Sequence, residues 1–465
     1  MHFISTKITL LIFLFICQFP FSVTYAFEKE ANEVIDAKTQ NILQLLEILK
    51  DNKTISKEQF ETLKTQFVKS ANLSIEDDYN DDDYDDGYSE DDESNLAIKT
   101  EGGLEVSTFD GQYSFELSGR ILYDYTLFSE DKNVLGNDSS LRKAYLGVEG
   151  KIDYDWGYEL TIDFAGGEAD IKDAYISYLG QTGWLWKFGH VKEPFSLSEL
   201  TSSKYSTFLE RPMLTEFSPG RSLGVNTITY GSHWTLAASL TSETWDNDPD
   251  DEGSEGWGST IRSTYAPWHT DTQALHFGVA LSYRETDDEQ KVKFDTRPET
   301  KNTGIKFLNT GKIKQVDNIT RMGLETAWVE GPFSAQAEYV FAELERQIEE
   351  NLSFSGWYVT ASWMVTGESR DYKFKKGSFG RMKPYSPFGA WEVALRYSAL
   401  DLNDKDITGG SGNISTIGIN WYVNERIRTM LNYAIVDNDE FADDDGDVLP
   451  SDNPNYVQLR LQIDF

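Results

Sequence analysis

Cysteine is almost absent from this sequence of 465 residues, since Cys17 is the only one, and no disulfide can staple the fold. Lipidation of Cys17 is excluded too, because a small residue would have to precede it and Ile16 stands there. Beyond the first 26 residues, no apolar run approaches the ~18 residues of a membrane-spanning helix. An exported chain of this kind enters a membrane only as a closed β-barrel.

Positive charge is scarce as well, with 42 basic residues against 78 acidic ones and a net charge of −36. General nucleic-acid binding is excluded, because it needs a basic face. An enzyme that pairs a nucleophile with a histidine is disfavoured by the few histidines of the sequence. Four histidines follow the first 26 residues and none lies in a recognisable motif: His190, His233, His269 and His276. We therefore expect no enzyme and no cofactor.

Two acidic stretches resemble calcium loops without completing the pattern. The EF-hand loop needs Asp or Asn at positions 1, 3 and 5 before a glycine, and a Glu at position 12. Before Gly87, position 3 is Tyr84, and the stretch from Asp248 to Gly253 lacks the final Glu. The sequence predicts no metal site.

The first 96 residues divide into three parts. Lys7, the apolar run 8–16 and the small residues around Ala26 predict a signal peptide over 1–26. Apolar residues at helical spacing predict a helical hairpin or a short coiled coil over 27–74, lying in the periplasm and able to tether the membrane to the cell wall. Residues 75–96 are predicted to be a disordered linker, because 76–93 hold 12 acids and no base.

From residue 97 to the end, the sequence alternates between apolar and polar residues. The last nine, VQLRLQIDF, place Val457, Leu459, Leu461, Ile463 and Phe465 on one face. Alternation of this kind suits a soluble sandwich with a dry core or a barrel whose apolar face meets lipid. The count of segments favours the barrel: 113–128, 141–152, 157–165, 171–180, 183–192, 223–230, 233–242, 259–266, 274–284, 320–330, 332–346, 354–366, 389–400, 414–424, 425–436 and 456–465.

Sixteen is an even number, and the connections are short at one end and long and acidic at the other, as in outer-membrane barrels. We therefore predict an all-β fold, a sixteen-stranded antiparallel transmembrane β-barrel over 97–465 in a Gram-negative outer membrane. The final Phe465 resembles the signal by which the barrel-assembly machinery recognises its substrates. The last strand is expected to close the barrel against the first, which leaves no open edge.

Several phrases resemble the phosphate-selective porins O and P. They include FELSGRILYDY, RKAYLGVEG, FGHVKEPFSLSELTSSKYSTFLER, TGESRDYK and GAWEVALRYSALDL, in the family's order. The resemblance implies a homotrimer, a third long loop folded into each pore, arginines that lead a small inorganic anion in, and lysines that lead it out. The positions that match the family's binding residues are Arg120, Arg142, Lys143, Tyr145, Ser202, Ser203, Lys204 and Arg262.

Three positions depart from the family's pattern. Glu101, Glu116 and Glu199 stand where the family usually carries lysine. A general or weakly cation-selective diffusion pore is therefore the alternative to an anion-preferring channel. Much of the remaining acidity lies in loops, where divalent ions can bridge it to lipopolysaccharide.

Overall fold

The computed structural model describes residues 50, 96–100, 103–242, 256–287 and 290–465. The chain divides into two compact units, Met1–Asp92 and Glu93–Phe465, and every strand belongs to the second. Apart from residues 50 and 96, the predicted signal peptide, helical segment and linker lie outside the described residues and stay predictions. Within the described part, the structure has no helix with the length and apolar character that a membrane span requires.

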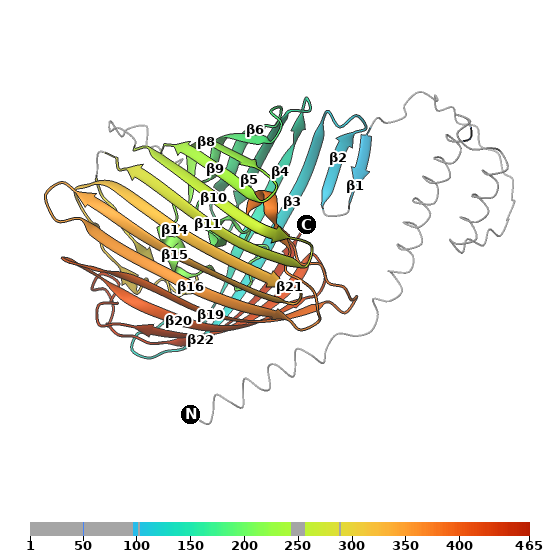
Figure 1. The fold of residues 1–465 in the computed structure, drawn as a ribbon. Helices are drawn as coiled ribbons and strands as arrows, with labels where there is room; N and C mark the ends of the chain where they lie inside the picture. Colours follow the sequence, from blue (N-terminus) through green and yellow to red (C-terminus); the bar gives the residue numbers. More distant parts are fainter. Residues whose placement is uncertain (1–49, 51–95, 101–102, 243–255, 288–289) are drawn as a thin grey trace. The chain divides into compact units, whose positions relative to one another are not determined.

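Sixteen antiparallel strands form a closed barrel, as the alternation predicted (Figure 1). The strands on the first half of the wall are β3 (Ser114–Ser129), β4 (Asp138–Ile152), β5 (Trp156–Asp163), β6 (Asp170–Tyr178), β7 (Trp184–Lys192), β8 (Arg221–Tyr230), β9 (Trp234–Thr241) and β10 (Gly258–His269). The second half holds β11 (Gln273–Glu285), β14 (Val316–Glu330), β15 (Phe333–Arg346), β16 (Leu352–Met364), β19 (Ala390–Asp404), β20 (Ile407–Tyr422), β21 (Ile427–Asn438) and β22 (Asn455–Asp464).

The two faces of the wall decide between the soluble sandwich and the membrane barrel. On the last strand, Leu461, Ile463 and Phe465 are 52%, 41% and 44% exposed. The alternate residues Arg460 and Asp464 are each 2% exposed, because they face an interior that other parts of the chain fill. A soluble protein buries the apolar face, whereas this wall presents it outward, as lipid requires.

The chain's last residue closes the barrel. The backbone of Phe465 exchanges both hydrogen bonds with Gly119 of β3, with N···O distances of 2.8 and 3.0 Å. A Cβ at position 119 would lie 2.2 Å from the Phe465 ring, so any residue larger than glycine would displace the ring from this position. The C-terminus lies beside β3 in Figure 1, and the predicted closure of the last strand against the first is confirmed.

One hairpin precedes the barrel and was not expected. It consists of β1 (Leu96–Lys99) and β2 (Leu104–Thr108), and all of it except Leu96 lies within the predicted barrel region 97–465, before the first predicted strand. Strand β2 pairs with Ser114–Leu117 of β3, while β22 pairs with the rest of the same edge from Arg120 onward. The hairpin therefore extends the wall along the edge that the shorter last strand leaves uncovered.

Three long connections carry secondary structure of their own. The long loop, residues 193–220, holds α4 (Leu197–Leu200) and the 3₁₀ turn η1 (Met213–Phe217). Residues 286–315 hold β12 (Asp295–Thr296) and β13 (Leu308–Asn309). The opposite-end segment, residues 365–389, holds β17 (Tyr372–Lys373), the 3₁₀ turn η2 (Phe374–Lys376) and β18 (Ser378–Phe379). The expectation of short turns at one end is wrong for this segment, because β16 and β19 meet at the short-turn end.

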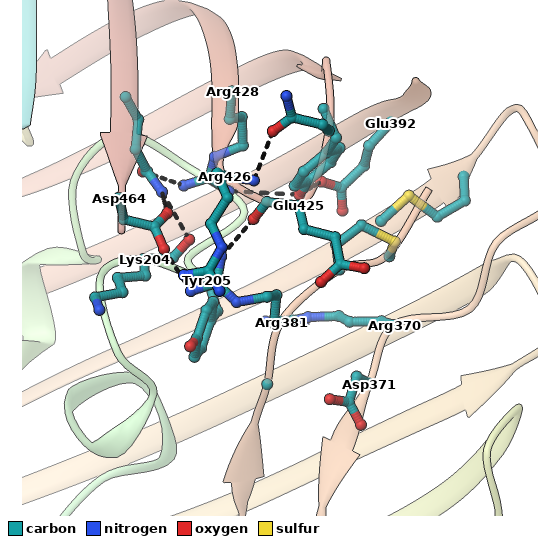
Figure 2. Close-up of a pocket in the computed structure, with 16 residues that line it drawn as sticks. Lys204, Tyr205, Arg370, Asp371, Arg381, Glu392, Glu425, Arg426, Arg428 and Asp464 are labelled. Carbon is teal, nitrogen blue, oxygen red and sulfur yellow. Dashed lines mark hydrogen bonds and ion pairs between the residues drawn. The ribbon is translucent and has the colours of Figure 1, made fainter. Parts of the chain in front are cut away.

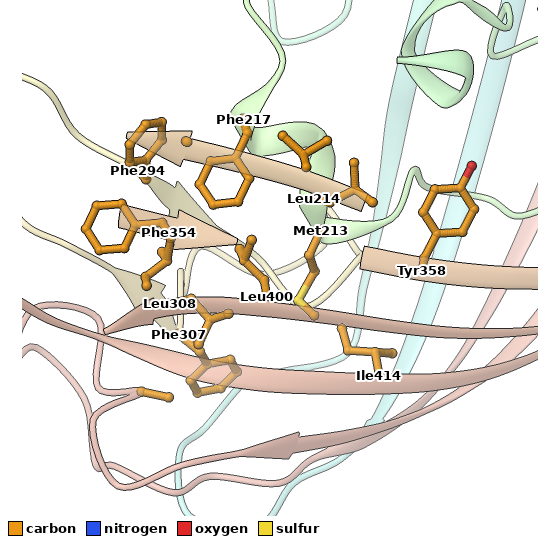
Figure 3. Packing of buried hydrophobic residues seen from close by; sticks show 14 of the residues in the cluster. Met213, Leu214, Phe217, Phe294, Phe307, Leu308, Phe354, Tyr358, Leu400 and Ile414 are labelled. Carbon is orange, nitrogen blue, oxygen red and sulfur yellow. The ribbon is translucent and has the colours of Figure 1, made fainter. Parts of the chain in front are cut away.

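An apolar core lies inside the barrel, where a simple pore would hold water. Figure 3 shows Met213, Leu214 and Phe217 of the long loop packed with Phe294 and Phe307 of the connection 286–315. Residues of the inner wall complete the cluster, among them Phe354, Tyr358, Leu400 and Ile414. The wall carries apolar side chains on its inner face here because the two connections must bury their own.

Candidate functional site in the barrel lumen

The long loop leaves β7 and returns to β8, yet its anchors lie on strands of the other half of the wall. The Glu338 carboxylate of β15 accepts hydrogen bonds from the backbone N–H groups of Leu197 and Ser198, at 2.9 and 2.7 Å. Arg396 of β19 donates to the Glu210 carbonyl at 2.8 Å, and Arg428 of β21 donates to the Ser206 carbonyl at 2.7 Å. The loop thus contacts both halves of the wall.

A β-bulge turns two consecutive basic residues toward the interior. The pairing of β3 with β4 shifts between Leu122 and Tyr123, which leaves Arg142 as the extra residue beside Lys143. A regular strand would point these two side chains to opposite faces. The bulge therefore explains how adjacent residues both reach the long loop.

Arg120 and Lys143 meet at one serine of the long loop. The Arg120 guanidinium donates to the Ser203 hydroxyl at 2.7 Å, and the Lys143 ammonium donates to the same oxygen at 3.0 Å. Both cations lie over the Tyr145 ring, 4.3 and 5.1 Å from its centroid. No carboxylate of the described residues lies within ion-pair distance of either cation.

Lys204 and Ser202 lie next to this group. The backbone N–H of Lys204 donates to the Ser202 hydroxyl at 3.4 Å, and the Lys204 carbonyl accepts from Gln462 at 3.1 Å. No acceptor in the described part of the chain takes a hydrogen bond from the Lys204 ammonium. Burial lowers the pKa of Lys204, and the charge of Arg120 lowers it further, while Asp464 opposes them.

Arg142 takes a different partner from its neighbour Lys143. Its guanidinium donates to both carboxylate oxygens of Glu210, with distances of 2.7 and 2.9 Å. Glu210 also accepts from Arg460 at 2.8 Å, and Arg460 in turn pairs with Asp124 at 2.6 Å. The structure therefore separates Arg142 from the Ser203 group.

Arg262 lies apart from the other predicted residues. It donates to Glu325 at 2.9 Å and to the Gly377 carbonyl of the opposite-end segment at 2.7 Å. His276 lies between Glu325 and Tyr372, at 2.9 and 2.6 Å. The geometry makes Arg262 an anchor of the opposite-end segment and does not bring it to Ser203.

The three acidic departures have different surroundings. Glu199 of the long loop pairs with Lys192 at 2.9 Å and with Arg211 at 3.3 Å. Burial alone would raise the pKa of Glu199, but these two cations lower it to about 2. Glu101 lies outside the described residues. Glu116 belongs to a row of four glutamates directly opposite one another on β2 to β5: Glu105, Glu116, Glu149 and Glu159.

Comparison with known proteins agrees with the barrel fold. Residues 115–465 match the family described as phosphate-selective porin O and P. Porin O of Pseudomonas aeruginosa is 31% identical over 417 residues, which cover 80% of this chain and 93% of the relative. The chain belongs to this family. It is an outer-membrane porin, and the resemblance noted in the sequence is confirmed.

Other proteins are more distant from this porin. A Caulobacter vibrioides protein is 29% identical over 347 residues, 70% of this chain and 69% of the relative. Among solved structures, OmpT of Vibrio cholerae is 12% identical with a TM-score of 0.49, covering 76% of this chain and 98% of that one. The channel DcaP of Acinetobacter baumannii is 15% identical with a TM-score of 0.45, covering 77% and 99%.

Sequence reasoning missed a recess of the porin that Figure 2 shows, between the long loop, the opposite-end segment and the last strands. Arg381 donates to the Glu425 carbonyl and to Asp464, and Arg428 donates to Gln462 at 2.9 Å. The cations that line the recess are Lys204, Arg370, Arg381, Arg426 and Arg428. Six basic residues between 370 and 383 could have indicated this recess. The prediction of short turns at that end of the barrel gave them no role.

Proposed function

We propose that this porin conducts small anions and prefers phosphate, with the long loop as the constriction. Arg120, Lys143, Ser203 and Lys204 bind the anion in this proposal, and Ser202 and Tyr145 support them. Arg142 and Arg262 are left out of direct contact, because Glu210 and Glu325 engage them. The cations of the recess and the exposed lysines of the opposite-end segment form the exit.

Phosphate loses part of its hydration in a narrow passage and needs hydrogen-bond donors in return. A guanidinium supplies a planar pair of donors, an ammonium supplies a compact charge, and a hydroxyl supplies a neutral donor. All three kinds meet at Ser203. Weak binding still suffices, because an ion must also leave the site for current to flow.

The observation that carries the proposal is the hydroxyl shared by Arg120 and Lys143. A serine oxygen has two acceptor positions, and these two cations occupy both. The Ser203 hydrogen is therefore free to be donated to a third group. Two cations without carboxylate partners and one free hydroxyl donor together suit a small oxyanion.

The alternative is a general or weakly cation-selective pore. The glutamate row on β2 to β5 favours it, because like charges directly opposite one another attract cations to relieve their repulsion. The row lies on one part of the wall, whereas the donors at Ser203 come from the wall and from the long loop. We expect the donors to decide selectivity, because they converge on one oxygen.

We further propose that the porin is a homotrimer whose N-terminal segment lies in the periplasm. Phe465 serves as the signal for the barrel-assembly machinery, since its ring faces outward at the end of the last strand. The acidic connections, such as residues 437–452, meet lipopolysaccharide through divalent ions.

Planar-bilayer recording tests the proposed function. Under a chloride gradient, the reversal potential should show anion preference, and added phosphate should block the chloride current. Lys204→Glu should abolish that block while the barrel still assembles, because it reverses a charge beside Ser203. Cation preference in the unaltered porin, or no block at any phosphate concentration, would decide for the general diffusion pore.

A further inference from the structure

Glu210 of the long loop lies between two arginines of the barrel wall. Its carboxylate accepts two hydrogen bonds from Arg142 on β4, at 2.7 and 2.9 Å, and one from Arg460 on β22, at 2.8 Å. The side chains of Glu210, Arg142 and Arg460 are 12%, 20% and 2% exposed. Such a bidentate pair, with little solvent around it, is among the strong interactions of charged groups.

The pairing divides the positive charge around the long loop into two groups. Arg142, Arg460, Asp124 and Glu210 form one group, in which each cation has a carboxylate partner. Arg120 and Lys143 form the other, in which Ser203 is the acceptor and no carboxylate is in range. Arg142 and Lys143 are neighbours in the sequence, yet Arg142 pairs with the Glu210 carboxylate and Lys143 bonds to the Ser203 hydroxyl.

The carboxylate of Glu210 occupies the donors that an oxyanion would use. The planar fork of an arginine binds a carboxylate and a phosphate with the same two parallel hydrogen bonds. We propose that Glu210 is a resident competitor of the transported oxyanion and sets the selectivity of the pore by keeping Arg142 out of the binding site. This inference rests on the proposed function, because the competing oxyanion is taken to be phosphate.

Glu210 is one of several anchors of the long loop, so its charge is not required to hold the loop in place. Glu338 binds the backbone of Leu197 and Ser198, and Arg428 binds the Ser206 carbonyl. Arg396 binds the backbone carbonyl of residue 210 itself at 2.8 Å, and that contact does not involve the carboxylate. A neutral side chain at position 210 thus leaves the backbone contacts in place.

The decisive variant is Glu210→Gln, which keeps the shape of the side chain and removes its charge. Arg142 then becomes available beside Arg120 and Lys143. We expect phosphate to block the chloride current at about tenfold lower concentration, the change that a gained charge-assisted hydrogen bond gives. The anion-to-cation permeability ratio from the reversal potential should also rise.

Two further variants separate competition from anchoring. Arg142→Gln in the Glu210→Gln background should return the block to the original concentration, because the freed donor is gone. Glu338→Gln loosens an anchor of the same loop without freeing a cation, and should leave the block unchanged or weaken it. Weaker block, or noisy and enlarged conductance, in the Glu210→Gln porin would overturn the proposal and leave Glu210 as an anchor.

The two proposals can fail separately. If phosphate does not block the unaltered porin, the proposed function fails. The reversal potential still tests Glu210 in that case, because its neutralisation should raise anion preference for chloride alone. An unchanged reversal potential in the Glu210→Gln porin would show that Arg142 stays out of the pathway for another reason.

Discussion

Among the segments that enter the lumen, the long loop and the opposite-end segment differ in charge. The long loop carries two basic and four acidic side chains, whereas residues 366–388 of the opposite-end segment carry six basic and two acidic ones. The wall binds the backbone of the loop through Glu338, Arg396 and Arg428 and its Glu210 side chain through Arg142 and Arg460. It binds the opposite-end segment through the Gly377 carbonyl and through the side chains of Tyr372 and Arg381.

The difference shows how an acidic chain can offer a local path to anions. The loop supplies acids that pair with wall arginines, so few of its charges face the passage. The opposite-end segment keeps Lys373, Lys375, Lys376 and Lys383 exposed in a protein whose net charge is −36. We therefore expect the position of each charge to affect ion preference more than the total charge does, because screening limits each charge to about 10 Å.

Both segments require a closed wall, and the largest effect should come from opening it. Deleting Phe465, or changing it to Asp, removes the outward ring and the final pairing with Gly119. We expect almost no assembled porin in the outer membrane, as measured by heat-modifiable migration on gels and surface labelling. Normal amounts of assembled Phe465-deleted porin would show that the last residue is dispensable for closure.

The anchor of the opposite-end segment should give the next largest effect. Arg262→Leu leaves Glu325 buried and lacking its strongest cation, since these side chains are 2% and 3% exposed. We expect a loss of about 3–5 kcal/mol in unfolding free energy, measured by denaturant titration in detergent. Lys99→Gln is the control, because it breaks the exposed pair with Glu105, where about 0–1 kcal/mol is usual. Equal losses in the two variants would remove any special role for Arg262.

The exposed lysines offer a way to make the two segments alike. Lys375→Gln and Lys376→Gln together should lower the anion-to-cation permeability ratio by roughly two- to threefold, because two exposed positive charges are removed from the proposed exit. The effect should shrink in 1 M salt, where screening acts within about 3 Å. Reversal potentials at low and high salt measure both statements. A change that does not depend on salt would point to altered structure.

The smallest effect concerns pH at Glu216 of the long loop. Burial raises the pKa of Glu216 to about 7, and the charge of Asp295 adds to the rise, while Lys301 and Lys306 oppose it. The folded protein thus holds this proton more tightly than the unfolded chain does. Protonated Glu216 therefore contributes to the free energy of unfolding. This contribution is complete below the ordinary pKa of 4.5 and is lost as pH rises through about 7.

Denaturant titrations at pH 5 and pH 8 should therefore differ by about 1–3 kcal/mol because of this group. Glu216→Gln should remove that part of the difference. If the pH dependence is the same in both proteins, Glu216 does not titrate in this range.

Much of the barrel could be predicted from the alternation of side chains. The period of two identified all sixteen strands, because each strand of a barrel meets lipid on one face along its whole length. The hairpin β1–β2 was not predicted, because Leu96–Lys99 and Leu104–Thr108 are too short to show a clear alternation of apolar and polar residues. The inward fold of the opposite-end segment was not predicted, because it depends on partners distant in sequence such as His276 and Glu325.

The site was harder to predict for the same reason. The motifs that resemble the family named Arg120, Lys143 and Ser203, which lie together in the structure, and their role in anion binding stays a prediction. The motif around a basic residue does not predict whether a carboxylate pairs with its side chain in the fold. Glu210 follows Ser203 by seven positions in the same quoted phrase, yet only the crossing of the long loop to β22 brings it to both arginines.

The pairing of Gly119 with Phe465 also sets the order in which the barrel can form. Phe465 lies 346 positions after Gly119 in the sequence. Contacts so far apart in sequence form slowly, because a large loss of chain entropy precedes any gain from them. We therefore expect the seal between β22 and β3 to form after the hairpins of neighbouring strands.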